Sequence, residues 1–195
     1  MDSLAEAERY FMGEAKVQQA AVDLAAALTE AGVLYAIAGG LAVSMHGRPR
    51  TTDDVDVLLT PDGLKRFKRY WLGRGYVERF PGSKNMRDAR SGVKIDVLLT
   101  GDYPGDGKPK PVRFPDPVDA AVRIDGLWTV GLPELIELKL ASGMTSPDRP
   151  RDFDDVIQLV RVLGLPRDFS SNLNAWVRVK FLELWGYAQR PNDDY

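Results

Sequence analysis

Two short apolar segments with aspartates inside them constrain the fold of this chain most. Residues 54–59 and 93–99 are rich in aliphatic and β-branched side chains, which is typical of buried strands. Aspartate is disfavoured there, because an ionised carboxylate among apolar neighbours needs a partner or a metal ion. Residues i and i+2 of a strand point to the same face, so Asp54 and Asp56 project together, and Asp96 can join them from a neighbouring strand. The sequence therefore predicts two adjacent strands that share one carboxylate site.

The three carboxylates predict a metal site. Converging carboxylates repel one another unless a cation lies between them, and a ligand set made only of oxygen favours Mg²⁺ or Mn²⁺. The usual chemistry of such a site is phosphoryl or nucleotidyl transfer. A different interpretation is an exposed acidic turn that begins at Asp53 and leads into the strand. The aliphatic neighbours of Asp56 and Asp96 argue against that interpretation.

A glycine pair, Gly39-Gly40, separates an apolar segment at 34–38 from a short helix expected at 41–46. Without a Cβ, such a turn brings backbone N–H groups close to phosphate oxygens, and the start of a helix adds favourable partial charge. A glycine pair after a strand is also a common tight turn. Its position shortly before Asp54 favours nucleotide binding.

Periodicity and turn residues predict an α/β (α+β) fold, a mixed β-sheet flanked by helices. We expect a core at residues 1–125 and a mainly helical C-terminal lobe at 126–195 that completes the active site. The two parts can be counted either as one domain or as a core with an appended lobe. A hairpin or a strand and turn is expected within 75–90, and the residues at 100–117, rich in proline and glycine, predict a loop. Strands are expected at 34–38, 54–59, 93–99 and 127–130. Helices are expected at 3–31, 41–46, 60–72, 117–122, 132–141, 152–163 and 169–189.

A lysine within an apolar helix stripe is a further candidate site residue. In the helix expected at 132–141, Lys139 continues the face formed by Leu132, Leu135 and Ile136. One interpretation is a lysine at the edge of the stripe whose amine reaches water. The other is a cation that points inward at the phosphates of a nucleotide and balances the carboxylates.

Charged residues also cluster around the start of the helix expected at 152–163. The cluster contains Arg149, Arg151, Asp152 and Asp155. Asp152 suits a purely structural role as an anion at a helix N-terminus. Asp155, one turn further on, is placed to pair with Lys139 or with an arginine.

Composition excludes several classes of function. The chain has no cysteine, which excludes disulfides, thiol catalysis and zinc–thiolate sites. No apolar run reaches the roughly 18 residues that span a bilayer, and the acidic N-terminus lacks the pattern of a signal peptide. We therefore expect a cytoplasmic protein with no membrane contact. The net charge of −2 gives no overall attraction to nucleic acid, and the basic residues at 65–74 suit either the solvated face of a helix or an RNA surface.

Together these residues resemble the nucleotidyltransferase superfamily of the DNA polymerase β type. The family pattern is a Gly-Gly or Gly-Ser turn, an Asp-x-Asp pair and a third aspartate on a neighbouring strand. Residues 39–40, residues 54–56 and Asp96 match that pattern.

A narrower resemblance is to the AbiEii-type toxin branch of this superfamily. Residues 39–56 are similar to its first motif, in which Gly-Gly-x-Ala precedes His-Gly-x-x-Arg-x-Thr-x-Asp-hydrophobic-Asp. Residues 132–141 and 149–155 are similar to the later signatures of the branch, with Arg151 in place of the usual lysine. The resemblance covers about residues 30 to 163.

The resemblance implies a nucleotidyltransferase fold and a reaction in which an NMP moves from an NTP to an acceptor hydroxyl with release of pyrophosphate. Two Mg²⁺ ions would bridge the triphosphate. Asp54 and Asp56 would hold the metals, and Asp96 would ligate the second metal or act as base. Lys139 and Asp155 match further catalytic positions of the branch. The nucleotide-binding residues expected from these motifs are Gly39, Gly40, Arg50, Thr52, Lys139 and Arg151.

The resemblance also implies partners. Members of the branch modify tRNA 3′ ends and are usually neutralised by a cognate antitoxin, so both a tRNA acceptor and an antitoxin are implied. The same core also serves transfer to a small molecule, as in aminoglycoside nucleotidyltransferases, or to a protein hydroxyl, and an inactive nucleotide-binding module is a further alternative. A positive stripe from the basic residues at 65–74 to the carboxylates would favour RNA, whereas an enclosed acidic pocket would favour an aminoglycoside.

Overall fold

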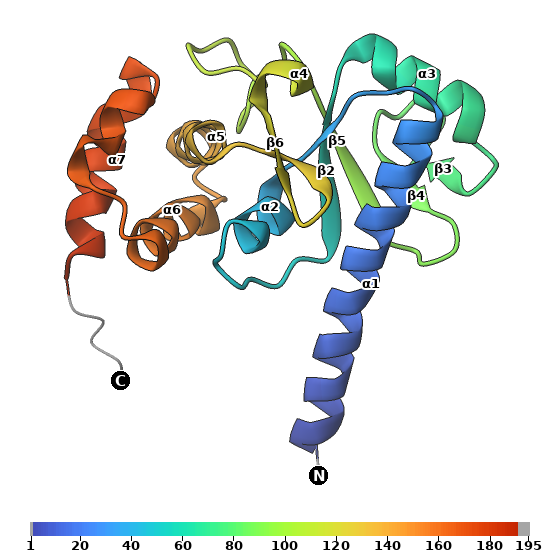
Figure 1. Cartoon of the computed structure of the whole chain (residues 1–195), viewed down its shortest axis with the longest axis horizontal. Helices are drawn as coiled ribbons and strands as arrows, with labels where there is room; N and C mark the ends of the chain where they lie inside the picture. The colour runs from blue at the N-terminus through green and yellow to red at the C-terminus, as the bar shows by residue number, and fades with distance from the viewer. Residues whose placement is uncertain (1, 191–195) are drawn as a thin grey trace.

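The structure of the chain, a computed structural model, describes residues 2–190. Within these residues the chain forms a seven-stranded mixed sheet in the order β3-β4-β5-β2-β1-β7-β6 (Figure 1). The α/β fold and the mixed sheet flanked by helices are therefore confirmed. The strands are β1 (Ala36–Ile37), β2 (Asp54–Leu59), β3 (Tyr76–Glu78), β4 (Met86–Asp88), β5 (Lys94–Leu99), β6 (Ala121–Ile124) and β7 (Leu127–Val130).

The two strands that carry the aspartates are neighbours at the centre of the sheet. β2 and β5 run parallel, in a register that pairs Asp56 with Asp96. β1 is antiparallel to β2 and parallel to β7. Because side chains alternate along a strand, Asp54, Asp56 and Asp96 share one face of the sheet while Val55 and Ile95 point to the other.

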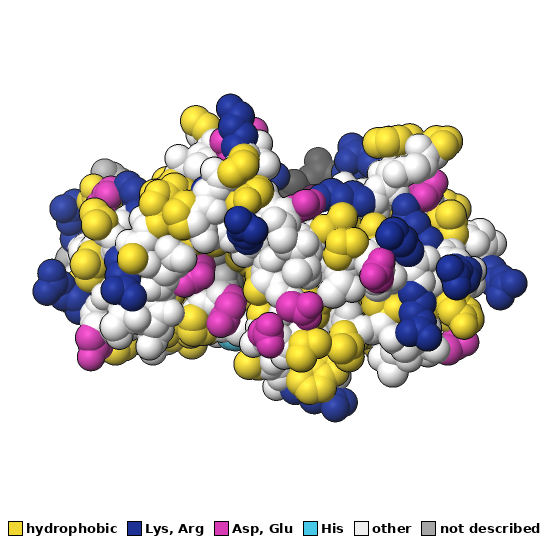
Figure 2. All heavy atoms as spheres, turned by 90° about the horizontal axis from the view of Figure 1, so that it is seen from above, with side chains coloured by type: hydrophobic (Ala, Val, Ile, Leu, Met, Phe, Trp, Pro, Cys, Tyr) yellow, Lys and Arg dark blue, Asp and Glu magenta, His cyan; other side chains and the backbone are white. Residues whose placement is uncertain are grey.

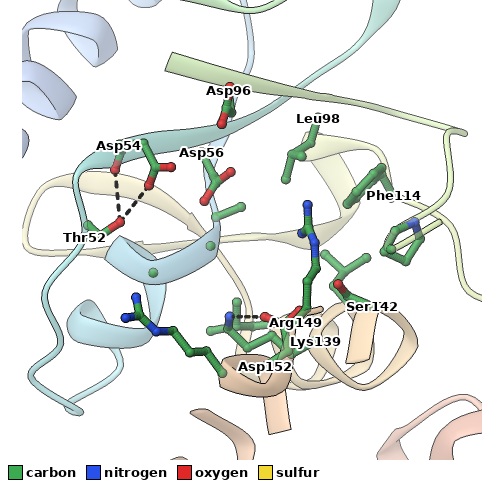
Figure 3. A pocket seen from close by; sticks show the side chains of 18 of the residues that line it. Thr52, Asp54, Asp56, Asp96, Leu98, Phe114, Lys139, Ser142, Arg149 and Asp152 are labelled. Atoms are coloured by element: carbon green, nitrogen blue, oxygen red, sulfur yellow. Dashed lines mark hydrogen bonds and ion pairs between the residues drawn. The ribbon is translucent and has the colours of Figure 1, made fainter. Parts of the chain in front are cut away.

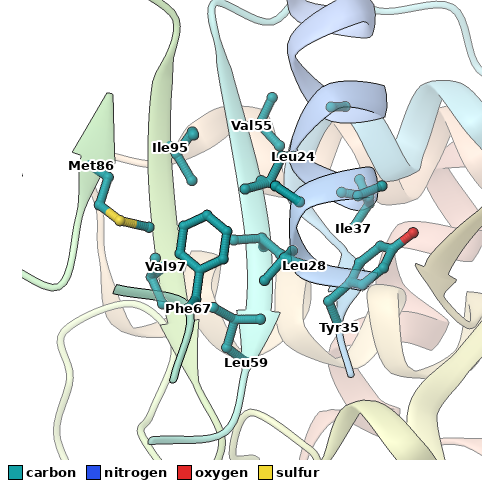
Figure 4. Close-up of a cluster of buried hydrophobic side chains, with 14 of the residues drawn as sticks. Leu24, Leu28, Tyr35, Ile37, Val55, Leu59, Phe67, Met86, Ile95 and Val97 are labelled. Atoms are coloured by element: carbon teal, nitrogen blue, oxygen red, sulfur yellow. The ribbon is translucent and has the colours of Figure 1, made fainter. Parts of the chain in front are cut away.

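Helices α1 (Asp2–Glu30) and α3 (Pro61–Trp71) cover the face of the sheet opposite the aspartates. Thr60 caps α3 by accepting a hydrogen bond from the N–H of Gly63, and Pro61 occupies its first turn, where a missing N–H is harmless. Figure 4 shows the resulting core, in which side chains of both helices pack on the central strands. Its members include Leu24, Leu28, Val55, Leu59, Phe67, Ile95 and Val97.

Four helices build a second core on the side of the sheet that carries the aspartates. They are α2 (Gly39–Met45), α5 (Leu132–Thr145) and two outer helices that pack on α5, namely α6 (Pro150–Leu163) and α7 (Ala175–Ala188). Their core includes Leu58 of β2, Leu140 of α5 and Phe181 of α7. Among the described residues, none of the helices combines the length and the apolar character needed to cross a bilayer.

The structure differs from the sequence-based expectation in two segments. The helix expected at 117–122 stops early, as α4 (Pro117–Ala120), and β6 follows it and pairs with β7 through an Asp125-Gly126 turn. An Asp-Gly pair is a strong hairpin signal, so the tight turn prevails over continuation of the helix. The helix expected at 169–189 is divided into a 3₁₀ turn, η1 (Arg167–Asn172), and α7. The side chain of Asn174 accepts a hydrogen bond from the N–H of Trp176 and so starts α7 as a separate helix.

The sheet also extends beyond residue 125, where the sequence suggested that the core ends. β7 lies at Leu127–Val130 and pairs with β1 through Thr129 and Ile37. The helical lobe, as the structure has it, begins with α5 at Leu132.

Candidate active site

Three aspartates line a cavity of about 460 Å³ between the sheet and the helical lobe. Asp54 and Asp56 project from β2 and Asp96 projects from β5, and the three lie close together in Figure 3. A volume of this size falls within the range of small-molecule sites, roughly 300–1,000 Å³. The structure therefore brings the three predicted carboxylates to one place.

The carboxylates disturb one another electrostatically. Burial, and next to it the charges of Asp54 and Asp96, raise the pKa of Asp56 to about 7. Burial and the charge of Asp54 also raise the pKa of Asp96. The cations of Lys139 and Arg149 act in the opposite direction on the pKa of Asp56 but do not outweigh these effects. The cavity thus holds an excess of negative charge at this wall.

The residues before the aspartates fix their orientation. Thr52 Oγ1 donates a 2.7 Å hydrogen bond to Asp54 Oδ1. Gly39 has φ +60°, and a Cβ at this position would lie 1.7 Å from Asp56 Oδ2. Only glycine can therefore occupy position 39 while the Asp56 carboxylate lies against the start of α2. Gly39, Gly40 and Thr52 all line the cavity, as a nucleotide-binding role requires.

Asp155 lies behind the cavity wall and does not line the cavity. It is 1% exposed and forms ion pairs with Arg50 and with Lys139, whose Nζ lies 2.7 Å from Asp155 Oδ2. Lys139 Nζ also donates a 3.0 Å hydrogen bond to Asp152. Removing one partner of a buried ion pair leaves an uncompensated charge. Asp155 thus positions Arg50 and Lys139, which do line the cavity.

The far side of this ion-pair network faces a second, open cavity of about 320 Å³. Arg48 and Asp154 line it, joined by a 2.8 Å ion pair, and Arg50 and Asp155 reach it as well. The same buried carboxylate is therefore approached from two sides.

Arg149 and Arg151 supply further positive charge opposite the aspartates. Both line the main cavity at the start of α6, and among the described residues neither guanidinium has an ion-pair partner. Figure 3 shows the Arg149 side chain extended across the cavity toward β5. Nucleotide binding was expected of Arg151, whereas Arg149 was recognisable in the sequence only as part of a charged cluster. Only the fold reveals that the residue before Pro150 points into the cavity.

The end of the cavity away from Asp54 is apolar. Leu98 of β5, Phe114 of the loop after β5, and Leu135 and Leu138 of α5 form its walls. Ser142 lines the same end, and its Oγ is the one buried side-chain polar atom without a hydrogen-bond partner in the described part of the chain. Such an unpaired group costs about 1–3 kcal/mol. No sequence signal marked this end, because Phe114 lies in a segment recognisable only as a loop and meets α5 through the fold.

The donor set of the aspartate wall fits a divalent cation, although the carboxylates do not form a closed cage. Within residues 2–190 no three His, Asp or Glu side chains are gathered as in a complete metal site. The three carboxylates offer only oxygen, and burial together with their mutual repulsion raises the pKa of Asp56 and of Asp96, an effect that a cation would oppose. Asp54, Asp56 and Asp96 therefore suit Mg²⁺ or Mn²⁺.

Comparison with known proteins finds similarity in structure and not in sequence. No protein-family model and no curated protein sequence matches the chain. An antigenic nucleotidyltransferase-like protein from Paracoccidioides brasiliensis superposes with a TM-score of 0.52 and 18% identity, over 76% of this chain and 77% of that chain. ANT(2″)-Ia, solved in complex with adenylyl-2″-tobramycin, superposes with a TM-score of 0.51 and 14% identity, over 81% of this chain and 92% of that chain. These likenesses establish that the chain has the fold of nucleotidyltransferases.

Proposed function

We propose that this protein is a metal-dependent nucleotidyltransferase that transfers an NMP from an NTP to an acceptor hydroxyl and releases pyrophosphate. One observation carries the proposal: Asp54, Asp56 and Asp96 line the same cavity as the cations of Lys139, Arg149 and Arg151. Carboxylates that suit a metal ion, opposite cations that suit phosphate, are the groups that nucleotidyl transfer requires. The nucleotidyltransferase fold supports the same function.

The three aspartates, Asp54, Asp56 and Asp96, form the acidic wall of the cavity and have two roles in this proposal. Asp54 and Asp56 would hold Mg²⁺ or Mn²⁺, and Asp96 would hold a second ion or accept the proton of the acceptor hydroxyl. Bound there, the metal would neutralise charge on the triphosphate and on the departing pyrophosphate. The acceptor oxygen forms a bond to the α-phosphorus, the bond from that phosphorus to the bridging oxygen breaks, and pyrophosphate leaves. The raised pKa of Asp96 favours its acceptance of the proton.

The remaining cavity residues would bind the triphosphate. Lys139 and Arg151 place charge beside the phosphates, and Arg149 adds a guanidinium that can donate two parallel hydrogen bonds. Arg50 lines the same cavity, and Thr52 orients Asp54. We also propose that the backbone N–H groups of Gly39 and Gly40 contact phosphate. Asp155 would act through Lys139 and Arg50.

We propose RNA, and specifically a tRNA 3′ end, as the acceptor. A groove of about 140 Å³ meets the main site at Asp96 and is lined by Arg79, Arg87 and Lys94. Among the described residues these three cations have no ion-pair partner, and the charges of Arg79 and Lys94 reach Asp96. Phosphates of an acceptor strand would neutralise them.

The basic residues of α3 do not contribute to this groove. α3 packs on the sheet face opposite the aspartates, and Lys68 is paired with Glu78. Figure 2 shows Lys and Arg side chains gathered over the end of the molecule that carries α3. The support for an RNA acceptor therefore comes from the groove beside Asp96 and not from α3.

A second candidate acceptor is a small molecule such as an aminoglycoside. The likeness to ANT(2″)-Ia, solved with an adenylylated tobramycin, favours it. The cations of the groove beside Asp96 argue against it, because they would repel a polyamine. A protein hydroxyl and an inactive nucleotide-binding module remain alternatives.

The physiological setting is proposed from the sequence resemblance. Residues 39–56 are similar to the first motif of the AbiEii-type branch, which favours a toxin-type enzyme in the cytoplasm with a cognate antitoxin. Synthesis of the native protein and of Asp56→Asn in a bacterial host would test this role, because only an active toxin should arrest growth.

The enzymatic proposal is tested by incubating the protein with Mg²⁺, each α-³²P-labelled NTP in turn, and total tRNA or tobramycin. We expect label in tRNA with the native protein and none with Asp56→Asn. Asp53→Asn is a matched control, because Asp53 is exposed and does not line the cavity. Label in tobramycin would reassign the acceptor. Absence of transfer to tRNA, tobramycin and protein would overturn the proposal.

A further inference from the structure

One end of the cavity has no part in the transfer chemistry described above. Ser142 is 5% exposed and is one of the residues that line the cavity, and its buried Oγ has no hydrogen-bond partner in the described part of the chain. A buried hydroxyl without a partner is unfavourable unless a ligand supplies one. The orphan hydroxyl therefore points to a polar atom of a bound molecule.

The surroundings of Ser142 restrict what that molecule can be. The walls are the side chains of Leu98, Phe114, Leu135 and Leu138. Apolar and aromatic walls with a single polar group suit a planar heteroaromatic ring better than a sugar or a phosphate, which need several polar partners. The chemistry of this slot fits a nucleobase.

The loop after β5 closes the slot and is held rigidly on α5. Lys110 Nζ donates hydrogen bonds to the backbone O of Pro104 at 2.5 Å and to Thr145 Oγ1 at 3.1 Å, and its side chain is 5% exposed. A Cβ on Gly105 would lie 2.2 Å from Thr145 Oγ1 and 3.0 Å from the backbone O of Ser142. The loop thus lies directly against the turn of α5 that carries Ser142.

The position of the slot indicates whether it receives the base of the NTP or a base of the acceptor. In Figure 3 the aspartates lie at one end of the cavity and Phe114 and Ser142 at the other, with Arg149 between them. Lys139 precedes Ser142 by one turn on α5. A nucleotide whose phosphates lie between Lys139, Arg149 and the aspartates would therefore direct its base toward Ser142. The groove beside Asp96 leaves a separate approach for the acceptor.

We propose that the slot of Leu98, Phe114, Leu135 and Leu138 holds the base of the NTP and that the Ser142 hydroxyl selects among bases by hydrogen bonding to the edge of the ring. This inference rests on the proposed nucleotidyltransferase function and names the residue that determines its nucleotide preference. A serine hydroxyl both donates and accepts hydrogen bonds, so the position of Ser142 on α5 decides which ring atom it meets.

The test measures binding and does not require turnover. Affinities of ATP, CTP, GTP and UTP with Mg²⁺, and of inorganic tripolyphosphate as a probe without a base, are determined by calorimetry. The native protein is compared with Ser142→Ala, Phe114→Ala and Ser146→Ala. Ser146 is the matched control, because it is a buried serine that directly follows α5 and does not line the cavity.

We expect the native protein to bind one NTP more tightly than the others and than tripolyphosphate. Ser142→Ala should reduce that preference about tenfold, which corresponds to roughly 1.4 kcal/mol, and leave tripolyphosphate binding unchanged. Phe114→Ala should weaken all four NTPs relative to tripolyphosphate, and Ser146→Ala should match the native protein. Removing an unpaired hydroxyl does not threaten folding, and thermal melting verifies this for each variant.

Two results would overturn the inference while leaving the proposed function intact. One is equal binding of the four NTPs and tripolyphosphate by the native protein. The other is a Ser142→Ala variant that keeps the native order and ratio of NTP affinities. If tripolyphosphate and every NTP fail to bind, the proposed function itself is overturned, and the inference with it.

Discussion

The carboxylate of Asp56, which is proposed to bind a metal ion, lowers the stability of the metal-free protein. Its pKa rises from 3.8 to about 7 through burial and the neighbouring charges of Asp54 and Asp96. An acid whose pKa is higher in the folded state than in the unfolded state binds its proton more tightly in the folded state. Its contribution to the free energy of unfolding therefore falls as the pH rises from about 4 to about 7. Above pH 7 the Asp56 carboxylate is ionised in the folded protein, and this lowers the free energy of unfolding by at most about 4 kcal/mol.

Asp56→Asn should accordingly stabilise the metal-free protein at pH 8, by up to about 4 kcal/mol, and change it little at pH 4. Urea unfolding in the presence of a chelator measures the difference. Asp53→Asn, at the exposed neighbouring position, should stay within about 0.5 kcal/mol of the native protein. Addition of Mg²⁺ should stabilise the native protein more than Asp56→Asn. A less stable Asp56→Asn variant at pH 8 would contradict this account.

Asp155 is expected to affect nucleotide binding through its two ion-pair partners, Arg50 and Lys139. Because it is buried and pairs with both Arg50 and Lys139, Asp155→Asn should raise KM for the NTP more than it lowers kcat. The pair Asp155→Asn and Lys139→Met should show a coupling free energy of about 1–3 kcal/mol in a double-mutant cycle of urea unfolding. Additive effects would mean that the two residues do not act as a unit.

At the scale of elements, the strands with a clear pattern were predictable and those without one were not. β2 and β5 follow from aliphatic runs interrupted by aspartate, and their shared face follows from the two-residue repeat. β6 has no such signal, because its four residues lie at an edge and are largely exposed or half-buried. The loop between β5 and α4 was recognisable as a loop, but its packing on α5 depends on Lys110 and Gly105, which meet residues far away in the sequence.

That loop should loosen when its anchor is removed. Lys110→Met deletes the hydrogen bonds to Pro104 and Thr145, so backbone amides within 101–114 should exchange hydrogen about tenfold faster. Amides of β2 should be unaffected. Lys108→Met is the matched control, since Lys108 lies in the same loop and is exposed. Equal exchange in the two variants would show that Lys110 does not anchor the loop.

At the scale of the whole molecule, the sequence led to the fold class and to the residues of the acidic wall. It did not reveal how the helical lobe completes the cavity. Arg149, Phe114 and Ser142 become neighbours only when the lobe docks on the sheet, and no local pattern encodes such distant contacts. The strand at 127–130 was expected, but its place in the sheet was not, because β7 pairs with β1 across about ninety residues of chain.

The positive charge of the groove beside Asp96 provides a test of whether the acceptor is RNA. Arg87→Ala in the groove beside Asp96 should weaken tRNA binding uniformly and reduce the slope of log K against log salt by about one, without changing NTP affinity. Arg69→Ala is the matched control, because Arg69 is an exposed arginine of α3, on the other face of the sheet. Filter binding across a series of salt concentrations measures both slopes. Equal slopes for Arg87→Ala and the native protein would remove the groove from the acceptor site.

The buried carboxylate of Asp155 has a consequence for inhibition. It is reached from the substrate side through Lys139 and from the outside through the second cavity, where Arg48 and Asp154 meet. A compound seated in the outer cavity would contact Arg50 and Asp155 and so disturb Lys139 without occupying the main cavity. Because this network is expected to act mainly on KM, the compound would weaken NTP binding from a distance, and by reciprocity a high NTP concentration would weaken the binding of the compound.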